Sequence, residues 1–178
     1  ITMIIGYHYH IPGIKKNGQF LTSSQQGIFI DGLALHAEKI ICYLHSPNDD
    51  ELITMDYVIK NRNVEIVNIG SHDSVYKRTL LPYIYTSKII SKDFDILFVR
   101  GPSPLMPILL LKYNRIPITL LIVGDYARFN VLHKKINIKN ILVFLWSKLN
   151  KIIQDYLIRD HLLLLNNQWL YKEYFDKQ

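Results

Sequence analysis

The stretch DILFVRGPSPLMPILLLKYNRIPITLLIVGD, residues 95–125, decides the fold, because it holds two apolar strands joined by a helix. The first strand, predicted over 94–100, stops abruptly on Arg100 and a glycine–proline turn, and a helix over 103–114 follows. The second strand, 116–124, is apolar almost throughout, which is typical of a parallel strand covered on both faces. The stretch therefore predicts a strand–helix–strand unit of a parallel sheet.

The same alternation of strands and helices extends over the rest of the chain. Apolar runs bounded by turn residues predict further strands at 3–8, 39–45, 64–70 and 161–167. Helical spacing predicts helices at 22–37, 75–91 and 137–160 and from 168 onward, whereas 10–20 is expected to be a loop. Alternating elements specify a parallel sheet with right-handed crossovers. We therefore expect a Rossmann-like α/β fold: a doubly wound parallel sheet of about six strands, in three α/β/α layers and in the order 3-2-1-4-5-6.

Composition limits the class of protein. The 178 residues suffice for one domain with a sizeable core, and no repeat or linker divides them, so residues 1–178 are expected to form a single Rossmann-like domain. The single cysteine, Cys42, excludes an intramolecular disulfide, and its apolar surroundings predict a buried thiol. No apolar run approaches the roughly 18 residues that span a bilayer. A reducing, cytoplasmic setting is expected.

The candidate site follows from the strand ends. In open parallel sheets, ligands bind beyond the carboxyl ends of the strands, near the point where the strand order reverses. The loops after the first, fourth and fifth strands are therefore expected to converge there. They supply the predicted acceptor-binding residues Gly13, Asn17, Gly18, Arg100, Gly101 and Ser103 and the predicted catalytic residue Asp125.

Each of these residues also has a purely structural alternative. Arg100 either binds a ligand or is a solvated strand end, and Ser103 either contacts a ligand or caps the next helix. Asp125 either acts as a general base toward a hydroxyl or caps a turn. His8 and His10 share one face of a strand, as metal ligands can, but no third ligand stands nearby, so no metal site is predicted.

Several common motifs are missing from the sequence. There is no G-x-G-x-x-G after the first strand and no G-x-x-x-x-G-K-[ST], which disfavours a dinucleotide site and a P-loop. There is no G-x-S-x-G either, which disfavours the usual hydrolase arrangement. The sequence thus predicts a cleft without a complete catalytic set.

Three stretches together resemble a known family. The opening MIIGYHYHIPG, the run DFDILFVRGPSPLMPILLLKYNRIPITLLIVGD and the closing DHLLLLNNQWLYKEYF are similar to the amino-terminal half of GT-B glycosyltransferases, in particular glycosyl transferase family 4. The resemblance covers essentially the whole chain. It departs from the family after the fifth strand, where Gly124–Asp125 keeps the Asp but lacks the His that is common there.

The resemblance implies a glycosyltransferase of hexosyltransferase type, which transfers a sugar from a nucleotide sugar to a glycan or lipid-linked acceptor in cell-surface polysaccharide synthesis. In that family the first domain binds the acceptor, and a second domain binds the nucleotide sugar. Residues 1–178 would be the acceptor-binding half, without a cofactor or metal of its own. By itself this half is not expected to be active.

Two other classes of function stay open. One is a non-catalytic doubly wound binding module. A receiver-like module would need acidic residues after the first strand, and a flavodoxin-like one a loop rich in Ser, Thr and Gly, and neither is present. The other is a nucleic-acid or membrane-surface binding domain, suggested by a basic stretch. Its aromatics Phe144 and Trp146 fall within an apolar helix, which disfavours base stacking.

The net charge of +6 comes from that basic stretch, because residues 126–154 contain basic residues but no acidic one. We expect these residues to face an anionic membrane surface and the protein to be peripheral on the inner face of the cell membrane. The predicted membrane-facing residues are Lys134, Lys135, Lys148, Lys151 and Trp146. The apolar residues of the helix, such as Leu145, Leu149 and Ile152, are expected to pack on the sheet.

Overall fold

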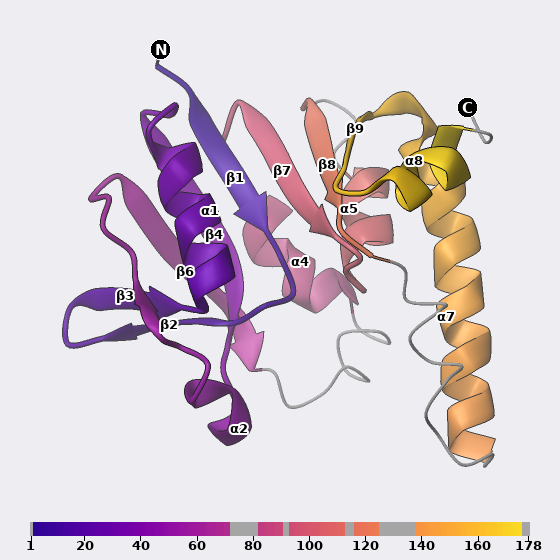
Figure 1. Cartoon of the computed structure of the whole chain (residues 1–178), viewed down its shortest axis with the longest axis horizontal. Coiled ribbons are helices and arrows are strands. Elements are labelled where there is room, and N and C mark those ends of the chain that lie inside the picture. Colours follow the sequence, from indigo (N-terminus) through magenta and orange to yellow (C-terminus); the bar gives the residue numbers. More distant parts are fainter. Residues whose placement is uncertain (1, 72–81, 91–92, 113–115, 125–137, 176–178) are drawn as a thin grey trace.

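The computed structural model describes residues 2–71, 82–90, 93–112, 116–124 and 138–175, and these contain a six-stranded parallel sheet (Figure 1). The strands of this sheet are β1 (Ile4–His8), β4 (Lys39–Ser46), β6 (Val64–Ser71), β7 (Ile96–Gly101), β8 (Ile118–Ile122) and β9 (Leu162–Leu165). They lie in the order β6-β4-β1-β7-β8-β9, and each neighbouring pair is parallel. In order along the chain this is 3-2-1-4-5-6, so the predicted doubly wound α/β fold is confirmed.

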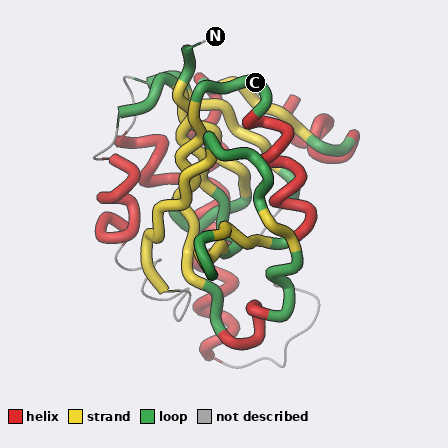
Figure 2. The backbone as a smooth tube through the Cα atoms, turned by 90° about the vertical axis from the view of Figure 1, so that its left-hand side faces the viewer, coloured by secondary structure: helices red, strands yellow, loops and turns green. Residues whose placement is uncertain are grey.

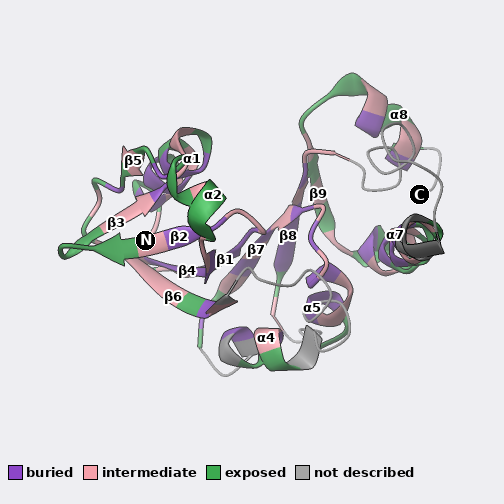
Figure 3. Ribbon diagram, turned by 90° about the horizontal axis from the view of Figure 1, so that it is seen from below, coloured by how far each residue is buried: buried purple, intermediate pink, exposed green. Residues whose placement is uncertain are grey.

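Helices cover both faces of the sheet, which gives the predicted three layers (Figures 2 and 3). The helices of the described residues are α1 (Ser24–Ala34), α2 (Asp49–Leu52), α4 (Pro82–Ile90), α5 (Met106–Lys112), α7 (Ile138–Leu157) and α8 (Gln168–Phe175), with a 3₁₀ turn at Ile158–Asp160. Figure 3 shows α1 on one face and α4 and α5 on the opposite face. None of these helices is both long and apolar enough to cross a bilayer.

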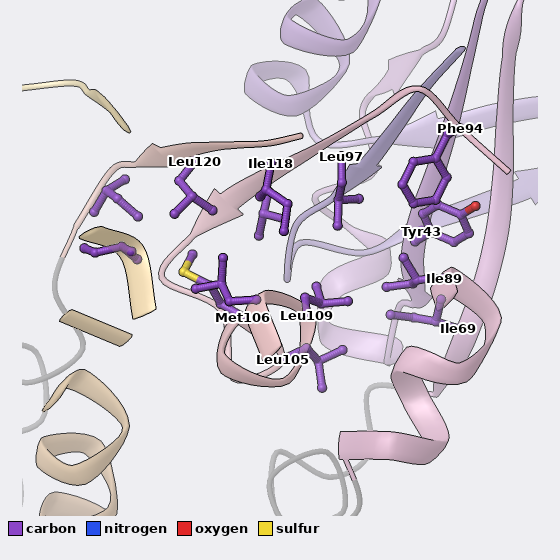
Figure 4. Close-up of a cluster of buried hydrophobic side chains, with 14 of the residues drawn as sticks. Tyr43, Ile69, Ile89, Phe94, Leu97, Leu105, Met106, Leu109, Ile118 and Leu120 are labelled. Carbon is purple, nitrogen blue, oxygen red and sulfur yellow. The ribbon is translucent and has the colours of Figure 1, made fainter. Parts of the chain in front are cut away.

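Each face of the sheet has its own hydrophobic core, because side chains alternate along a strand. On one face, Leu97, Ile118 and Leu120 of the sheet pack over Met106 and Leu109 of α5 (Figure 4). On the face covered by α1, the core includes Ile5, Tyr7, Cys42, Leu44 and Ile30. Cys42 is fully buried as expected, and burial raises the pKa of its thiol well above the usual value.

The segment after β1 differs from the prediction, because it is a β-hairpin and not a loop. Strands β2 (Gly13–Lys16) and β3 (Gln19–Thr22) pair antiparallel, and β5 (Tyr57–Val58) adds a third strand to this small sheet. The turn residues Asn17 and Gly18 have φ angles of 51° and 78°, the left-handed region that Asn and Gly tolerate. An Asn-Gly pair between strands is a strong hairpin signal, and the expected loop was wrong here.

Helix α1 is fixed to this small sheet through two carboxylates. The Asp56 carboxylate accepts hydrogen bonds from the Ser24 backbone N–H and hydroxyl, both at 2.8 Å, and so satisfies the amino end of the helix. In the middle of the helix, Asp31 accepts from the Tyr57 hydroxyl at 2.9 Å and from the backbone N–H groups of Lys60 and Asn61 at 3.0 Å. These bonds hold the amino end of α1 beside the carboxyl edge of the main sheet.

The orientation of α7 is opposite to the one expected from the sequence. Its buried side chains include Ser147, Asn150 and Gln154, which are polar, while Leu145 and Ile152 are exposed to solvent. The expectation that the apolar face of this helix packs on the sheet was therefore wrong for the side chains that the structure describes.

Candidate functional site

The ends of β1 and β7 lie side by side at the carboxyl edge of the sheet, and they bring Arg100 to Tyr9. In the register of the two strands Tyr7 is opposite Phe98, so the residues two further along each chain are again neighbours. The guanidinium carbon of Arg100 lies 4.6 Å from the centroid of the Tyr9 ring and 5.6 Å from that of Phe29 on α1. Both distances are in the range of cation–π attraction. Arg100 is thus held between two aromatic rings.

Phe29 also belongs to a set of three ring–ring contacts, with Tyr7 and Phe98. The centroids of Phe29 and Phe98 are 5.7 Å apart, and Tyr7 lies 5.8 Å from Phe29 and 6.4 Å from Phe98. Burial raises the pKa of the Tyr7 hydroxyl well above its usual value, although the charge of Arg100 acts in the opposite direction. Tyr7 therefore stays neutral at physiological pH, and Arg100 is not neutralised by it.

Polar atoms without a protein partner lie at the same end of α1. Gln26 is fully buried, and neither atom of its amide has a hydrogen-bond partner among the described residues. The same holds for the Ser23 hydroxyl and for Nε of Arg100. Buried polar groups are nearly always paired in folded proteins, so such groups at a sheet edge point to a ligand or to water. Gln26 stands one helical turn before Phe29, on the same end of the helix.

Ser103 has a structural role. Its side chain is fully buried, and its hydroxyl donates to His8 Nε2 at 2.9 Å and accepts from the Leu105 N–H at 3.3 Å. His8 Nδ1 lies 3.0 Å from the Tyr43 carbonyl oxygen, which can only accept, so Nδ1 carries the proton and Nε2 accepts from Ser103. These bonds join the ends of β1, β4 and β7. Direct contact of Ser103 with a ligand, as predicted, is not what this geometry indicates.

Gly101 is also occupied by packing. A Cβ at this position would lie 2.2 Å from Met106 Cε and 3.1 Å from Ile122 Cδ1, so the core requires a glycine here. It was predicted to let the backbone approach a ligand. Gly101 instead faces α5, on the side of the sheet opposite to Arg100, because neighbouring residues of a strand point to opposite faces.

The predicted loop residues after β1 do not join Arg100 as expected. Gly13 is buried in β2, where a Cβ would lie 2.7 Å from Leu44 Cδ1, and its small size serves packing. Asn17 and Gly18 form the exposed tip of the hairpin, which extends away from β7 (Figure 1). Asp125 lies outside the described residues. Of the predicted site residues that the structure describes, Arg100 is the one that lies in the aromatic group.

Sequence reasoning missed Tyr9, Phe29 and Gln26 as site residues. Tyr7 and Tyr9 alternate along one strand and therefore share a face, and Gln26 and Phe29 are three residues apart on a helix. These spacings show which residues share a face. They do not show that the two faces meet at Arg100, because that depends on how α1 crosses the sheet.

Two hollows are lined by described residues, and neither of them includes Arg100. One of about 410 Å³ lies beside the amino ends of β4 and β6, and its charges include the ion pair of Lys39 with Glu65 at 2.7 Å. Another of about 440 Å³ between β9 and α8 is lined mainly by leucine and aromatic side chains. No group of three or more potential metal ligands occurs in the described part of the chain.

The fold and the site together define a class: a doubly wound α/β protein that presents an arginine between aromatic rings at the carboxyl edge of its sheet. Comparisons with known proteins add nothing to this definition, since no protein-family model, no curated protein and no solved structure matches the chain.

Proposed function

We propose that the chain is the acceptor-binding half of a glycosyltransferase, which binds a glycan or a lipid-linked sugar that receives a hexose from a nucleotide sugar. The observation that carries the proposal is the position of Arg100, between Tyr9 and Phe29 at the carboxyl edge of the sheet. Doubly wound sheets bind their ligands at this edge. The resemblance of the sequence to glycosyl transferase family 4 supports the same assignment.

The chemistry of the group suits a sugar or a sugar phosphate. The half-buried ring of Phe29 offers a flat apolar surface on which the C–H face of a sugar ring can pack, whereas the Tyr9 ring is buried and holds Arg100 in place. The Arg100 guanidinium supplies several N–H donors in a fixed plane, which bind hydroxyl oxygens or, in a lipid-linked acceptor, phosphate oxygens. The Ser23 hydroxyl provides a further donor and acceptor group, and the fully buried, unpartnered amide of Gln26 lies on the same end of α1.

The proposal divides the reaction between two parts of a complete enzyme. This part orients the acceptor hydroxyl, and Asp125, which follows β8 in the sequence, serves as the general base that takes its proton. A donor-binding part supplies the nucleotide sugar, so this part needs no cofactor or metal of its own. Nucleotide sugars and lipid-linked acceptors meet at the cytoplasmic side of the cell membrane, which is the location that we propose, with cell-surface polysaccharide as the product.

Titration calorimetry of the 178-residue chain with hexose 1-phosphates and with neutral methyl hexosides tests the proposal. Wild-type protein should bind the phosphates, and Arg100→Met should weaken binding by about tenfold or more, because a charge-assisted hydrogen bond contributes about 1.5–3 kcal/mol. Arg159→Met is the matched control, since Arg159 also lies over a tyrosine ring, 5.7 Å from that of Tyr156, and should bind like wild type. Equal binding by all three proteins would contradict the proposal.

A further inference from the structure

Helix α7 exposes a continuous apolar face. Among its described side chains, those exposed to solvent are Ile141, Leu145, Lys148, Leu149, Ile152, Ile153 and Tyr156. Leu145 and Leu149 are each 56% exposed and Ile152 is 65% exposed. At 3.6 residues per turn the six apolar members fall within one arc of the helix about 120° wide, next to Lys148. We call these six residues the α7 stripe.

The opposite face of α7 is already used for packing. Ser147, Asn150 and Gln154 are buried against the rest of the protein, and Lys151 forms ion pairs with Asp155 at 3.4 Å and with Glu173 of α8 at 2.8 Å. Figure 3 shows α7 at the β9 end of the molecule with its buried residues toward the other elements. The α7 stripe is therefore not part of the core, although a surface helix normally turns its apolar residues inward.

Two exposed basic residues lie beside the stripe, and exposed Asp160 follows one of them, Arg159, in the sequence. Lys148 lies on its border, and its ammonium group stands 5.6 Å from the centroid of the Phe144 ring. Arg159, just past the end of the helix, stands over Tyr156 of the stripe. Asp155 is the acidic residue in α7, and it is paired with Lys151. Of the residues predicted to face a membrane, Lys134 and Lys135 lie outside the described residues, and Lys151 is engaged in ion pairs.

We propose that the α7 stripe docks on an anionic lipid membrane, with α7 lying in the plane of the interface. An apolar arc with aromatic and basic residues on its borders is the pattern of helices that bind in this way. The apolar side chains enter the boundary between headgroups and acyl chains, while Lys148 and Arg159 contact acidic headgroups. This proposal goes beyond the binding of an acceptor and stands on α7 alone.

A second copy of the chain suits this surface less well. Leu145, Leu149, Ile152 and Tyr156 are spaced as in a two-helix seam, but the seam of a coiled coil is narrow, whereas the stripe also includes Ile141 and Ile153. Paired helices would also bring the basic borders of two copies together. Asp155, the acidic residue of α7, is already paired with Lys151.

Flotation of the 178-residue chain with vesicles tests the proposal. The vesicles are either neutral phosphatidylcholine or a mixture with phosphatidylglycerol, and each is used at low and at high salt. Wild type should bind the anionic vesicles about tenfold more tightly than the neutral ones, and high salt should reduce that difference. The triple variant Leu145→Gln/Leu149→Gln/Ile152→Gln should lose about tenfold or more in binding to the anionic vesicles while its thermal unfolding stays cooperative.

The control is a second triple variant with exposed apolar residues elsewhere, Ile28→Gln/Leu35→Gln/Ile53→Gln, which should bind vesicles like wild type. Equal binding of wild type to neutral and anionic vesicles would overturn the proposal, and so would retained binding by the first variant. A concentration-dependent dimer in sedimentation velocity that the first variant abolishes, without vesicle binding by wild type, would assign the stripe to a contact between copies. The assay contains no sugar, so its failure is distinct from a failure of acceptor binding.

Discussion

At the scale of single residues, two kinds of polar group lie at the carboxyl edge of the sheet. Ser103 and His8 are buried and satisfied by each other, and they join three strand ends. Arg100 and Gln26 have polar atoms that no described residue satisfies. The first pair contributes to stability, while half-buried Arg100 of the second pair is available to a ligand and Gln26 lies fully buried. Substitution of Ser103 should therefore lower the stability of the fold, whereas substitution of Arg100 should lower ligand binding.

Ser103→Ala should destabilise the fold. It leaves His8 Nε2 and the Leu105 N–H without their partner in a buried place, which costs about 1–3 kcal/mol in the free energy of unfolding. Urea unfolding measures this loss. Ser87→Ala is the control, because the Ser87 hydroxyl is exposed and bonds only within its own helix, to the Ile84 carbonyl, so its change should be within about 0.5 kcal/mol. A loss no larger than the control would mean that the bond to His8 adds nothing.

Asp31 should make stability depend on pH in the acid range. Burial acts to raise its pKa, but the hydrogen bonds from Lys60 and Asn61 outweigh burial and hold the pKa below 3.8. The folded state thus binds this proton less readily than the unfolded state, and the contribution of Asp31 is complete above pH 3.8 and is lost as the pH falls through the folded pKa.

Asp31→Asn should therefore lower the free energy of unfolding by about 1–2 kcal/mol at neutral pH, and the difference from wild type should shrink as the pH falls through the folded pKa of Asp31. Urea unfolding at several pH values measures it. Exposed Asp93 provides the control Asp93→Asn, which should follow wild type. A constant difference between Asp31→Asn and wild type from pH 7 to pH 2 would exclude this role of the carboxylate.

At the scale of elements, two glycines of α1 should respond in opposite ways to alanine. A Cβ at Gly27 would meet the Tyr57 ring at 2.1 Å, so Gly27→Ala should destabilise by about 1–3 kcal/mol through overpacking. A Cβ at Gly32 meets nothing within 4 Å, so Gly32→Ala should stabilise by about 0.5–1 kcal/mol through helix propensity. Thermal unfolding of both variants checks the signs. The same sign for both would show that α1 packs differently on β5.

Local patterns predicted the elements of the main sheet but not the faces that meet. Each strand has its own apolar run, and alternation with helices implies parallel pairing, so the order from β6 to β9 followed. The hairpin was missed because the Asn17–Gly18 turn was taken for part of a loop. The contact of Arg100 with Tyr9 and Phe29 joins three distant parts of the chain, and no spacing reveals it.

For helix α7 too, local patterns did not predict which face packs against the rest of the protein. Helical spacing identifies two sets of residues on opposite faces, one containing Leu145 and Leu149 and the other containing Ser147 and Gln154. Hydrophobicity favours burial of the first set, but the structure buries the second. Which face packs depends on the neighbours of the helix, here including Glu173, which pairs with Lys151. The basic stretch in the sequence was the signal for the membrane docking that we propose for this helix.

At the scale of the whole molecule, the arginine site and the α7 stripe belong to different parts of the structure, so their functions should separate. Arg100→Met should weaken sugar-phosphate binding and leave vesicle binding as in wild type. The Leu145/Leu149/Ile152 triple variant should do the reverse. Calorimetry and flotation on the same protein preparations measure the two effects. Loss of both activities in either variant would indicate global unfolding or one shared site.

The central claim is that the edge formed by β1, β7 and α1 binds a sugar-containing acceptor. Nuclear magnetic resonance tests it most directly, by titration of ¹⁵N-labelled chain with hexose 1-phosphates while the backbone amide shifts are followed. The account predicts saturable shift changes that are largest at Tyr9, Gln26, Phe29 and Arg100 and are absent in Arg100→Met. Changes confined to the groove between β9 and α8, or no saturable change at any residue, would contradict it.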